Sequence, residues 1–246
     1  MFGNSAVLLT GSAGGVGQAL VRAFSDAGYI VIGLDRGTTP GAYHSLEIDL
    51  AGLATSDDAF DAMNNTLNEA LGSRPLAALV NNAAIQVLGT VNDLSVSDFR
   101  STMDVNLVAA FALVKLTLPY LETNNGCVIN VGSIHGRLTK PRFSAYATSK
   151  GALETLTRAL AVELGDRIRV NAISPAAVDT PMLRAGFEEK SEALNALAEC
   201  HPAGRISTAT EVAELAVFLT GNSARFINGA VLDINGAIGS RLHDPV

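Results

Sequence analysis

Cysteine is scarce in this chain of 246 residues, which contains Cys127 and Cys200 and no other cysteine. Two cysteines form no disulfide framework, and their spacing is not that of metal-ligand pairs. We therefore expect two reduced thiols, as is typical of cytoplasmic proteins, and no metal site.

Charged residues are also few, at 17% of the chain, and acidic residues (24) outnumber basic ones (17). The net charge of −7 argues against nucleic acid or an acidic membrane surface as the main partner. No apolar run approaches the roughly 18 residues that a membrane helix requires. The N-terminal MFGNSAVLLTGSAGG lacks the basic segment and the long apolar run of a secretion signal. The expectation is a soluble cytoplasmic protein.

Hydrophobic residues, in contrast, make up 48% of the chain and occur in short runs separated by longer helical patterns. We expect these runs to be strands, at 6–10, 29–34, 45–49 (the weakest), 76–81, 126–133, 168–174 and 229–234. Apolar spacings of three and four predict helices between them, near 16–27, 57–71, 97–121, 147–164 and 209–220. This alternation predicts a doubly wound, three-layer α/β/α fold of the Rossmann type with seven mainly parallel strands, in one domain spanning 1–246.

One stretch, about 176–208, shows no strand pattern. It is polar, rich in Ala and Glu and partly helical, and it lies between the sixth and seventh expected strands. Met182, Leu183 and Phe187 precede an acidic helix expected at 188–199. An excursion at this edge is either a lid that excludes water from a site or ordinary surface packing, and the sequence leaves both open.

A glycine-rich turn, TGSAGGVG at 10–17, follows the first expected strand and opens a helix. A diphosphate that binds at a helix N-terminus must approach backbone N–H groups closely, and a Cβ would block it. The turn predicts nucleotide binding by Gly11, Ser12, Gly14, Gly15, Val16 and Gly17.

Asp35 ends the second expected strand, about 20 residues beyond the glycine turn. A carboxylate there accepts hydrogen bonds from the ribose hydroxyls of adenosine and repels a 2′-phosphate, which favours NAD over NADP. The adjacent Arg36 complicates this prediction, because an arginine can stack on adenine or hold a phosphate.

Tyr146 and Lys150, in SAYATSK (144–150), are four residues apart, which places both side chains on one face of a helix. A free phenol has a pKa near ~10, and a nearby cation favours the phenolate. The two residues are therefore either a tuned acid–base pair or an amphipathic pair at the beginning of a helix. This stretch alone does not distinguish the two.

Taken together, the motifs resemble those of the short-chain dehydrogenase/reductase family. Besides the glycine turn, the matching segments are NNAA (81–84), Asn106 in VNLVAAF, Ser133 in INVGS, YATSK (146–150), NAISPAAVDTPM (171–182) and GAVLDINGA (229–237). Two positions depart from the family pattern, since Ala84 and Ala176 stand where glycine is usual. The match covers nearly the whole chain in the right order.

This resemblance implies a catalytic set of Asn106, Ser133, Tyr146 and Lys150. Tyr146 would be the general acid/base, and Lys150 would lower its pKa and bind the nicotinamide ribose. Ser133 would polarise the substrate oxygen, and Asn106 would hold a water in a proton relay. Further cofactor contacts would come from Asp49, Leu50, Asn81, Ala83, Pro175, Val178 and Thr180.

The substrate itself is not specified by the resemblance. We expect a small alcohol or ketone, with contacts from Ser133, Gln86, His135, Arg142 and Met182. The loop IHGRLTKPRF (134–143) is basic in an acidic protein, so its residues either receive an anionic substrate group or are simply solvated. By resemblance, the helices near 97–121 and 147–164 would build a homodimer or homotetramer.

Three functions are therefore compatible with the sequence. The leading one is an NAD(H)-dependent oxidoreductase acting on a secondary alcohol or ketone. The first alternative is an NADPH-dependent 3-oxoacyl thioester reductase, against which Asp35 argues. The second, from another class, is a non-catalytic nucleotide-binding scaffold, and the complete catalytic set argues against it.

Overall fold

A parallel sheet of seven strands forms the centre of the computed structural model, which describes residues 4–187 and 191–242. Its strand order is β3-β2-β1-β4-β5-β6-β9. The strands are β1 (Ala6–Thr10), β2 (Ile30–Asp35), β3 (His44–Glu47), β4 (Leu76–Asn81), β5 (Cys127–Val131), β6 (Arg169–Pro175) and β9 (Val231–Ile234). This confirms the predicted doubly wound α/β fold.

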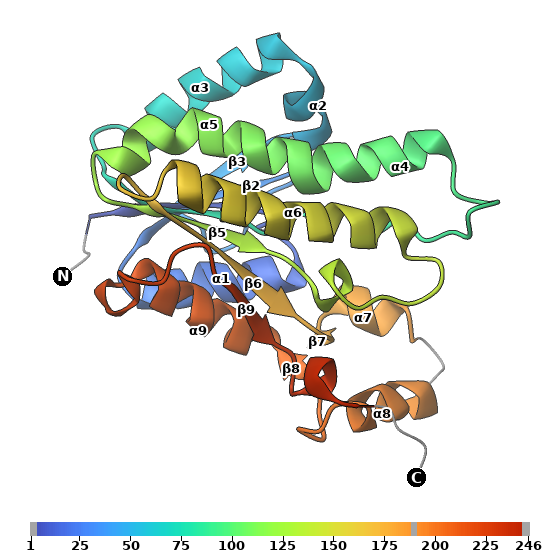
Figure 1. Ribbon diagram of the computed structural model, residues 1–246. Helices are drawn as coiled ribbons and strands as arrows, with labels where there is room; N and C mark the ends of the chain where they lie inside the picture. Colours follow the sequence, from blue (N-terminus) through green and yellow to red (C-terminus); the bar gives the residue numbers. More distant parts are fainter. Residues whose placement is uncertain (1–3, 188–190, 243–246) are drawn as a thin grey trace.

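Helices cover both faces of this sheet (Figure 1). On one face lie α2 (Leu50–Thr55), α3 (Asp57–Leu71), α4 (Val96–Met103), α5 (Ala109–Glu122) and α6 (Ser144–Glu163); on the other lie α1 (Gly15–Asp26) and α9 (Ala209–Thr220). The remaining helical elements are α7 (Pro181–Ala185), α8 (Ser191–Glu199) and short turns at Ile134–Gly136 (η2), Asn222–Ala224 (η3) and Ile238–Ser240 (η4).

Two separate cores lie on the two faces of the sheet, and alternate residues of the central strands supply them. In β1, Leu8 packs with Leu113 of α5 and Leu160 of α6, whereas Leu9 packs with Leu20 of α1 on the opposite face. All of β1 is buried, which explains why it reads as a continuous apolar run. Each fully buried leucine of this kind contributes about 1.5–3 kcal/mol of burial free energy.

The helix that runs from Val96 to Glu122 joins α4 and α5 through one π-helical turn, η1 (Asp104–Val108). Its 27 residues include a window with mean hydropathy 1.4, so by length and composition it could cross a membrane. The expectation that no segment approaches this requirement was therefore wrong. The apolar character of α5 reflects its packing on the sheet, where Leu113, Leu116 and Leu121 are buried.

The excursion between β6 and β9 contains α7, α8 and a second, two-stranded parallel sheet of β7 (Val178–Asp179) and β8 (Ser207–Thr208). The prediction that 176–208 lacks strands was therefore wrong. These strands have only two residues each, too few to show an alternating pattern. The first part of the expected acidic helix, 188–190, lies outside the described residues.

The carboxyl ends of the parallel strands all meet at one edge of the sheet. The loops after β1, β4, β5 and β6 emerge there, and the excursion with α7 lies against the same edge (Figure 1). Ligands of doubly wound folds bind at this edge, which is where the predicted site residues gather.

Candidate active site

The glycine turn after β1 is built so that side chains are excluded at two positions. Gly11 has a φ of +63°, and a Cβ on it would lie 2.7 Å from Cα of Ala83. A Cβ on Gly17 would lie 2.0 Å from the carbonyl oxygen of Gly11. The turn therefore packs backbone to backbone against the loop after β4, and it leads into α1 without any side-chain cap on the helix N-terminus. Uncapped backbone N–H groups at a helix N-terminus form a cradle for a phosphate group.

Thr10 and Asn82 fasten this turn to β4, and sequence reasoning missed both. The hydroxyl of Thr10 accepts hydrogen bonds from the backbone N–H of Asn82 and of Ala83, each at 3.0 Å. The side-chain amide of Asn82 donates to the carbonyl oxygens of Thr10 and Gly11, also at 3.0 Å. Both residues stand in the quoted motifs TGSAGGVG and NNAA, so the signal was present but had no assigned role.

Asp35 lies at the mouth of the same turn. Its carboxylate accepts a hydrogen bond from the backbone N–H of Ala13 at 2.8 Å and another from that of Arg36 at 2.7 Å. Ser12, in contrast, is fully buried and its hydroxyl is bonded to that of Thr39 at 2.6 Å. The backbone of Ser12 is also engaged within the protein, since its N–H donates to the carbonyl oxygen of Leu34 at 3.5 Å and its carbonyl oxygen accepts from the Gln18 amide at 3.0 Å. Ser12 therefore shapes the turn.

The segment that follows β6 meets the glycine turn directly. A Cβ on Gly15 would lie 2.9 Å from Cβ of Thr180 and 2.9 Å from Cδ of Pro181. Thr180 caps α7, since its hydroxyl accepts a hydrogen bond from the backbone N–H of Leu183 at 3.3 Å. Two segments that are 165 residues apart in the sequence are thus adjacent, which brings the predicted diphosphate and nicotinamide contacts to one place.

The other predicted cofactor residues lie at the ends of neighbouring strands. Asp49 precedes α2 and caps it through the backbone N–H of Ala51, and Leu50 is buried beside it. Asn81 ends β4 and donates to the side-chain oxygen of Asn130 at 2.9 Å. Pro175 ends β6, Val178 lies in β7, and Val16 packs at the edge of the core in α1.

Tyr146 and Lys150 lie one turn apart near the beginning of α6, as predicted. The ammonium of Lys150 lies 5.8 Å from the centre of the Tyr146 ring and donates a hydrogen bond to the carbonyl oxygen of Val131 at 2.7 Å. Burial lowers the pKa of Lys150 to about 8, against an opposing effect of Glu154. Burial raises the pKa of Tyr146, while a hydrogen bond with Ser133 acts in the opposite direction.

Ser133 follows β5 and begins the η2 turn, where its hydroxyl accepts a hydrogen bond from the backbone N–H of His135 at 3.2 Å. The ring of His135 stacks on Phe143 at 4.3 Å and meets Tyr146 edge-on at 6.0 Å. Burial, and secondarily Lys140, lower the pKa of His135, which favours its neutral form. Ser133, Tyr146 and Lys150 are thus brought together from two elements.

Asn106 occupies the π-helical turn in the middle of the long helix and is buried. Its side-chain oxygen accepts a hydrogen bond from the backbone N–H of Ile85 at 2.8 Å, and its amide donates to the carbonyl oxygen of Ile85 at 3.0 Å. The amide also donates to the hydroxyl of Ser149, next to Lys150. Asn106 therefore ties the loop after β4 to the start of α6.

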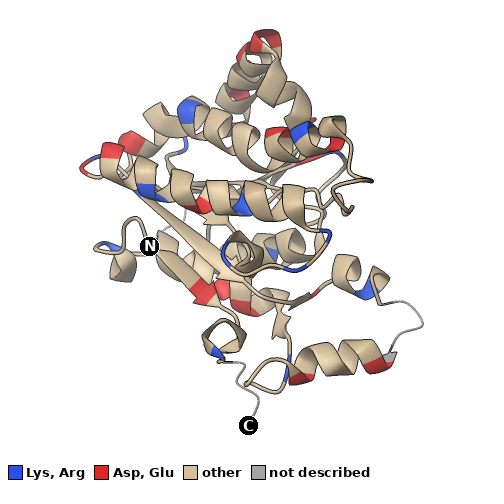
Figure 2. Ribbon diagram, turned by 45° about the vertical axis from the view of Figure 1, so that its right-hand side comes forward, with Lys and Arg blue, Asp and Glu red and all other residues tan. Residues whose placement is uncertain are grey.

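The predicted substrate contacts lie around the rim of this site. Gln86, Arg142 and Met182 are all exposed, and the backbone N–H of Gly89 donates to the carbonyl oxygen of Arg142 at 3.1 Å. The basic loop at 134–143 lies at the same edge of the sheet as α7 (Figure 2). Arg137 forms an ion pair with Asp233 at 2.7 Å, so its charge already has a partner.

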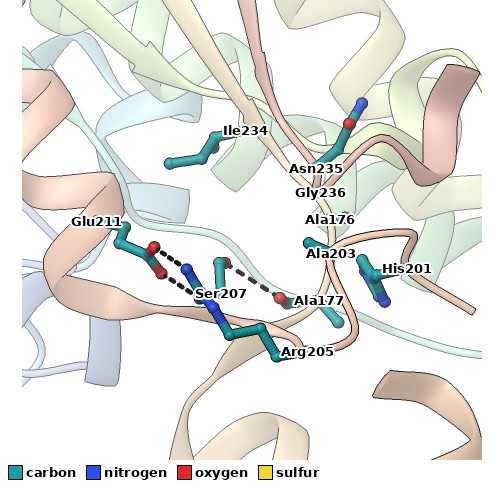
Figure 3. Close-up of a pocket in the computed structure, with 10 residues that line it drawn as sticks. All are labelled: Ala176, Ala177, His201, Ala203, Arg205, Ser207, Glu211, Ile234, Asn235 and Gly236. Atoms are coloured by element: carbon teal, nitrogen blue, oxygen red, sulfur yellow. Dashed lines mark hydrogen bonds and ion pairs between the residues drawn. The ribbon is translucent and has the colours of Figure 1, made fainter. Parts of the chain in front are cut away.

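A cavity of about 110 Å³ is lined by residues of the segment after β6 and of the turn after β9 (Figure 3). Its walls include Ala176, Ala177, His201 and the ion pair of Arg205 with Glu211. Nε2 of the buried His201 has no hydrogen-bond partner among the described residues. The cavity borders Ala176 and Ala177, just before Val178, and none of the predicted catalytic residues lines it.

The fold and this site define a class of protein: a Rossmann-type nucleotide-binding protein with Ser, Tyr and Lys gathered beside the glycine turn. A family model described as Enoyl-(Acyl carrier protein) reductase matches residues 11–237. The chain belongs to the short-chain dehydrogenase/reductase family, whose members are NAD(P)-binding oxidoreductases that act on alcohol groups.

Individual relatives cover the chain almost completely. Meso-2,3-butanediol dehydrogenase of Serratia marcescens is 32% identical over 96% of this chain and 94% of its own length. L-fucose dehydrogenase of Mus musculus is 33% identical over 96% of this chain and 88% of its own length. The ligand-free structure of Thermoplasma acidophilum aldohexose dehydrogenase superposes with a TM-score of 0.92 at 28% identity, covering 100% of this chain and 98% of the other.

Proposed function

We propose that the protein transfers a hydride between NAD(H) and a secondary alcohol or ketone, with Tyr146 as the general acid/base. The observation that carries this proposal is the position of Lys150, which is 2% exposed and lies beside Tyr146 at the sheet edge where the glycine turn begins. Burial of a lysine ammonium is unfavourable unless a nearby group compensates its charge. A phenolate at Tyr146 would provide that compensation and would itself be stabilised by Lys150.

The residues around the glycine turn fit a dinucleotide. Gly11 and Gly17 allow close backbone packing in the turn, and the N-terminus of α1 has no side-chain cap. We assign Asp35 to the adenosine ribose and Thr180, which abuts Gly15, to the nicotinamide end. When bound, the nicotinamide supplies the hydride acceptor or donor. Arg36, Asp49, Leu50, Asn81, Ala83, Pro175 and Val178 complete the proposed binding set.

In the proposed mechanism, Ser133 holds the substrate oxygen and Tyr146 exchanges a proton with it through the phenol oxygen. Lys150 stabilises the phenolate and binds the nicotinamide ribose, and Asn106 serves the proton relay from Lys150 to solvent. Phe143 and His135 pack beside Tyr146 and limit the access of water to it. In this proposal α7, in the described part of the excursion, acts as a lid, since Thr180 and Pro181 lie against Gly15 and Met182 is exposed.

A panel of secondary alcohols, hydroxy acids and polyols with NAD⁺ tests this function through NADH absorbance. The relatives named for a diol and for sugars make polyhydroxylated alcohols the first compounds to try. We expect NADH formation with at least one compound. Failure of the whole panel in both reaction directions would contradict the proposal.

Cofactor choice provides a separate prediction at Asp35. Because the carboxylate repels a 2′-phosphate, the protein should use NAD⁺ in preference to NADP⁺. Asp35→Ser should lower kcat/KM for NAD⁺ and raise it for NADP⁺, changing their ratio by about 10-fold or more, which corresponds to 1.4 kcal/mol. An unchanged ratio would contradict the role assigned to Asp35, and a wild type that prefers NADPH would favour the alternative 3-oxoacyl thioester reductase.

We also propose that the protein is a cytoplasmic homo-oligomer, a dimer or tetramer. Phe111 on α5 is 48% exposed and Val162 on α6 is 88% exposed, so both of the helices expected at subunit contacts carry uncovered apolar side chains. Phe226, after η3, is fully exposed. Light scattering should give a multiple of the 25.5 kDa chain mass, and a monomer mass would contradict this proposal.

A further inference from the structure

A buried carboxylate, Glu154, lies one helical turn beyond Lys150 on α6. It is 8% exposed, and its Oε1 accepts a hydrogen bond from the hydroxyl of Ser174 in β6 at 3.3 Å. Burial of a carboxylate is unfavourable unless it is paired, and one neutral hydroxyl compensates only part of that free energy. None of the roles derived so far uses this residue.

Glu154 packs against the backbone on both sides of Ser133. A Cβ on Gly136 would lie 2.8 Å from Oε1 of Glu154, and a Cβ on Gly132 would lie 3.6 Å from the same atom. A Cβ on Gly151 would lie 3.0 Å from the carbonyl oxygen of Gly136, so the turn and α6 also touch directly. The turn that carries Ser133 is therefore seated on the side chain of Glu154 and on the backbone of α6.

The charged groups around Glu154 are Lys150 and Arg158 on α6, Arg137 after η2 and Asp233 on β9. Burial is the main reason that the pKa of Glu154 is raised, and the two arginines act in the opposite direction. Glu154 in turn favours the protonated form of Lys150, whose pKa burial has lowered to about 8.

We propose that Glu154 is a positioning residue of the active site. Its carboxylate seats the turn that carries Ser133 and, from one helical turn away on α6, complements the ammonium charge of Lys150. This inference rests on the proposed oxidoreductase function, since it assigns Glu154 a part in the same site.

Glu154→Gln tests the electrostatic part, because glutamine keeps the shape and an acceptor for Ser174 but removes the charge. We expect the pKa of Lys150 to fall and the alkaline limb of the kcat profile to move to lower pH. NMR of the protein labelled with ¹³C-lysine can follow the pKa of Lys150. The chain has only four lysines, Lys115, Lys140, Lys150 and Lys190, so the signals are few. This titration needs no substrate, so it remains informative if the proposed function fails.

Glu163→Gln is the matched control, because Glu163 lies on the same helix, has the same charge and is exposed. It should leave both the Lys150 titration and the pH profile as in the wild type. A Lys150 titration in Glu154→Gln that matches the wild type, or equal shifts in both variants, would overturn the proposal.

Glu154→Ala tests the seating of Ser133. Displacement of a reacting group by about 1 Å can lower the rate on the order of 10²-fold, so we expect kcat to fall 10- to 100-fold with the Kd for NAD⁺ unchanged. A wild-type kcat in this variant would contradict the seating role. If Glu154→Ala does not fold, the result for Glu154→Gln still decides the electrostatic part.

Discussion

Replacement of Tyr146 by phenylalanine should lower kcat on the order of 10²- to 10⁴-fold, the usual contribution of a general acid/base. The change removes only the phenol oxygen. The ring keeps its edge-on contacts with Phe143 at 6.3 Å and His135 at 6.0 Å, so the start of α6 should remain folded. Because the glycine turn is untouched, NAD⁺ should bind with wild-type affinity, which calorimetry can measure.

The control for loss of a phenol oxygen is Tyr43→Phe. Tyr43 is 58% exposed, its hydroxyl accepts a hydrogen bond from Arg74, and it is none of the residues assigned to catalysis or to cofactor binding. The kcat of the Tyr43→Phe variant should equal that of the wild type. A Tyr146→Phe variant with full turnover of a true substrate would contradict the assigned role and revive the non-catalytic interpretation.

Gly17→Ala should disable cofactor binding and also destabilise the fold. The new Cβ would lie 2.0 Å from the carbonyl oxygen of Gly11 and 2.8 Å from Cα of Ser12, and neither backbone atom can move without distorting the turn. Overpacking of this kind lowers the free energy of unfolding by about 1–3 kcal/mol. Urea unfolding measures this change, and calorimetry should show NAD⁺ affinity reduced at least tenfold, or 1.4 kcal/mol.

Gly52→Ala provides the matched control for stability. Gly52 lies in α2, and a Cβ there would meet no atom closer than Oδ2 of Asp49 at 3.8 Å. Alanine in an open helical position should raise the free energy of unfolding by up to about 1 kcal/mol. If Gly17→Ala and Gly52→Ala had the same free energy of unfolding, the contacts of the new Cβ at Gly17 would cause no strain, and the predicted destabilisation would be wrong.

The central sheet could be predicted from the sequence because buried parallel strands leave a strong local signal. Five residues from Ala6 to Thr10 are all buried, and the apolar run AVLLT marks them directly. The elements that were missed or misjudged have no such signal. Strands β7 and β8 are two residues long, and the pairing of Val178 with Ser207 is determined by the packing of the excursion.

The apolar helix from Val96 to Glu122 shows a different limit. Composition cannot distinguish a membrane-spanning helix from one that packs on a sheet, and only the burial of residues such as Leu113 separates them here. Similarly, the π-helical turn at Asn106 depends on hydrogen bonds to Ile85, a residue from another loop. Helical periodicity alone does not reveal such a turn.

Some features of the candidate site could be predicted from local sequence, and others depend on long-range contacts. Local geometry explains why Tyr146 and Lys150 meet, since a spacing of four residues on a helix is sufficient. The contact of Gly15 with Thr180, the anchoring of the turn by Asn82 and the packing of Glu154 under Ser133 are long-range consequences of the strand order. Such contacts can be identified only in the three-dimensional structure.

The most direct test of the proposed reaction is to follow the hydride itself. NADH carrying deuterium in both positions at C4 of the nicotinamide, so that transfer from either face delivers deuterium, can be incubated with the wild type and with the ketones corresponding to the alcohol panel, and the products analysed by mass spectrometry. The account predicts an alcohol with deuterium on its carbinol carbon, formed by the wild type and lost in Tyr146→Phe. Absence of deuterium from every product of the wild type would contradict it.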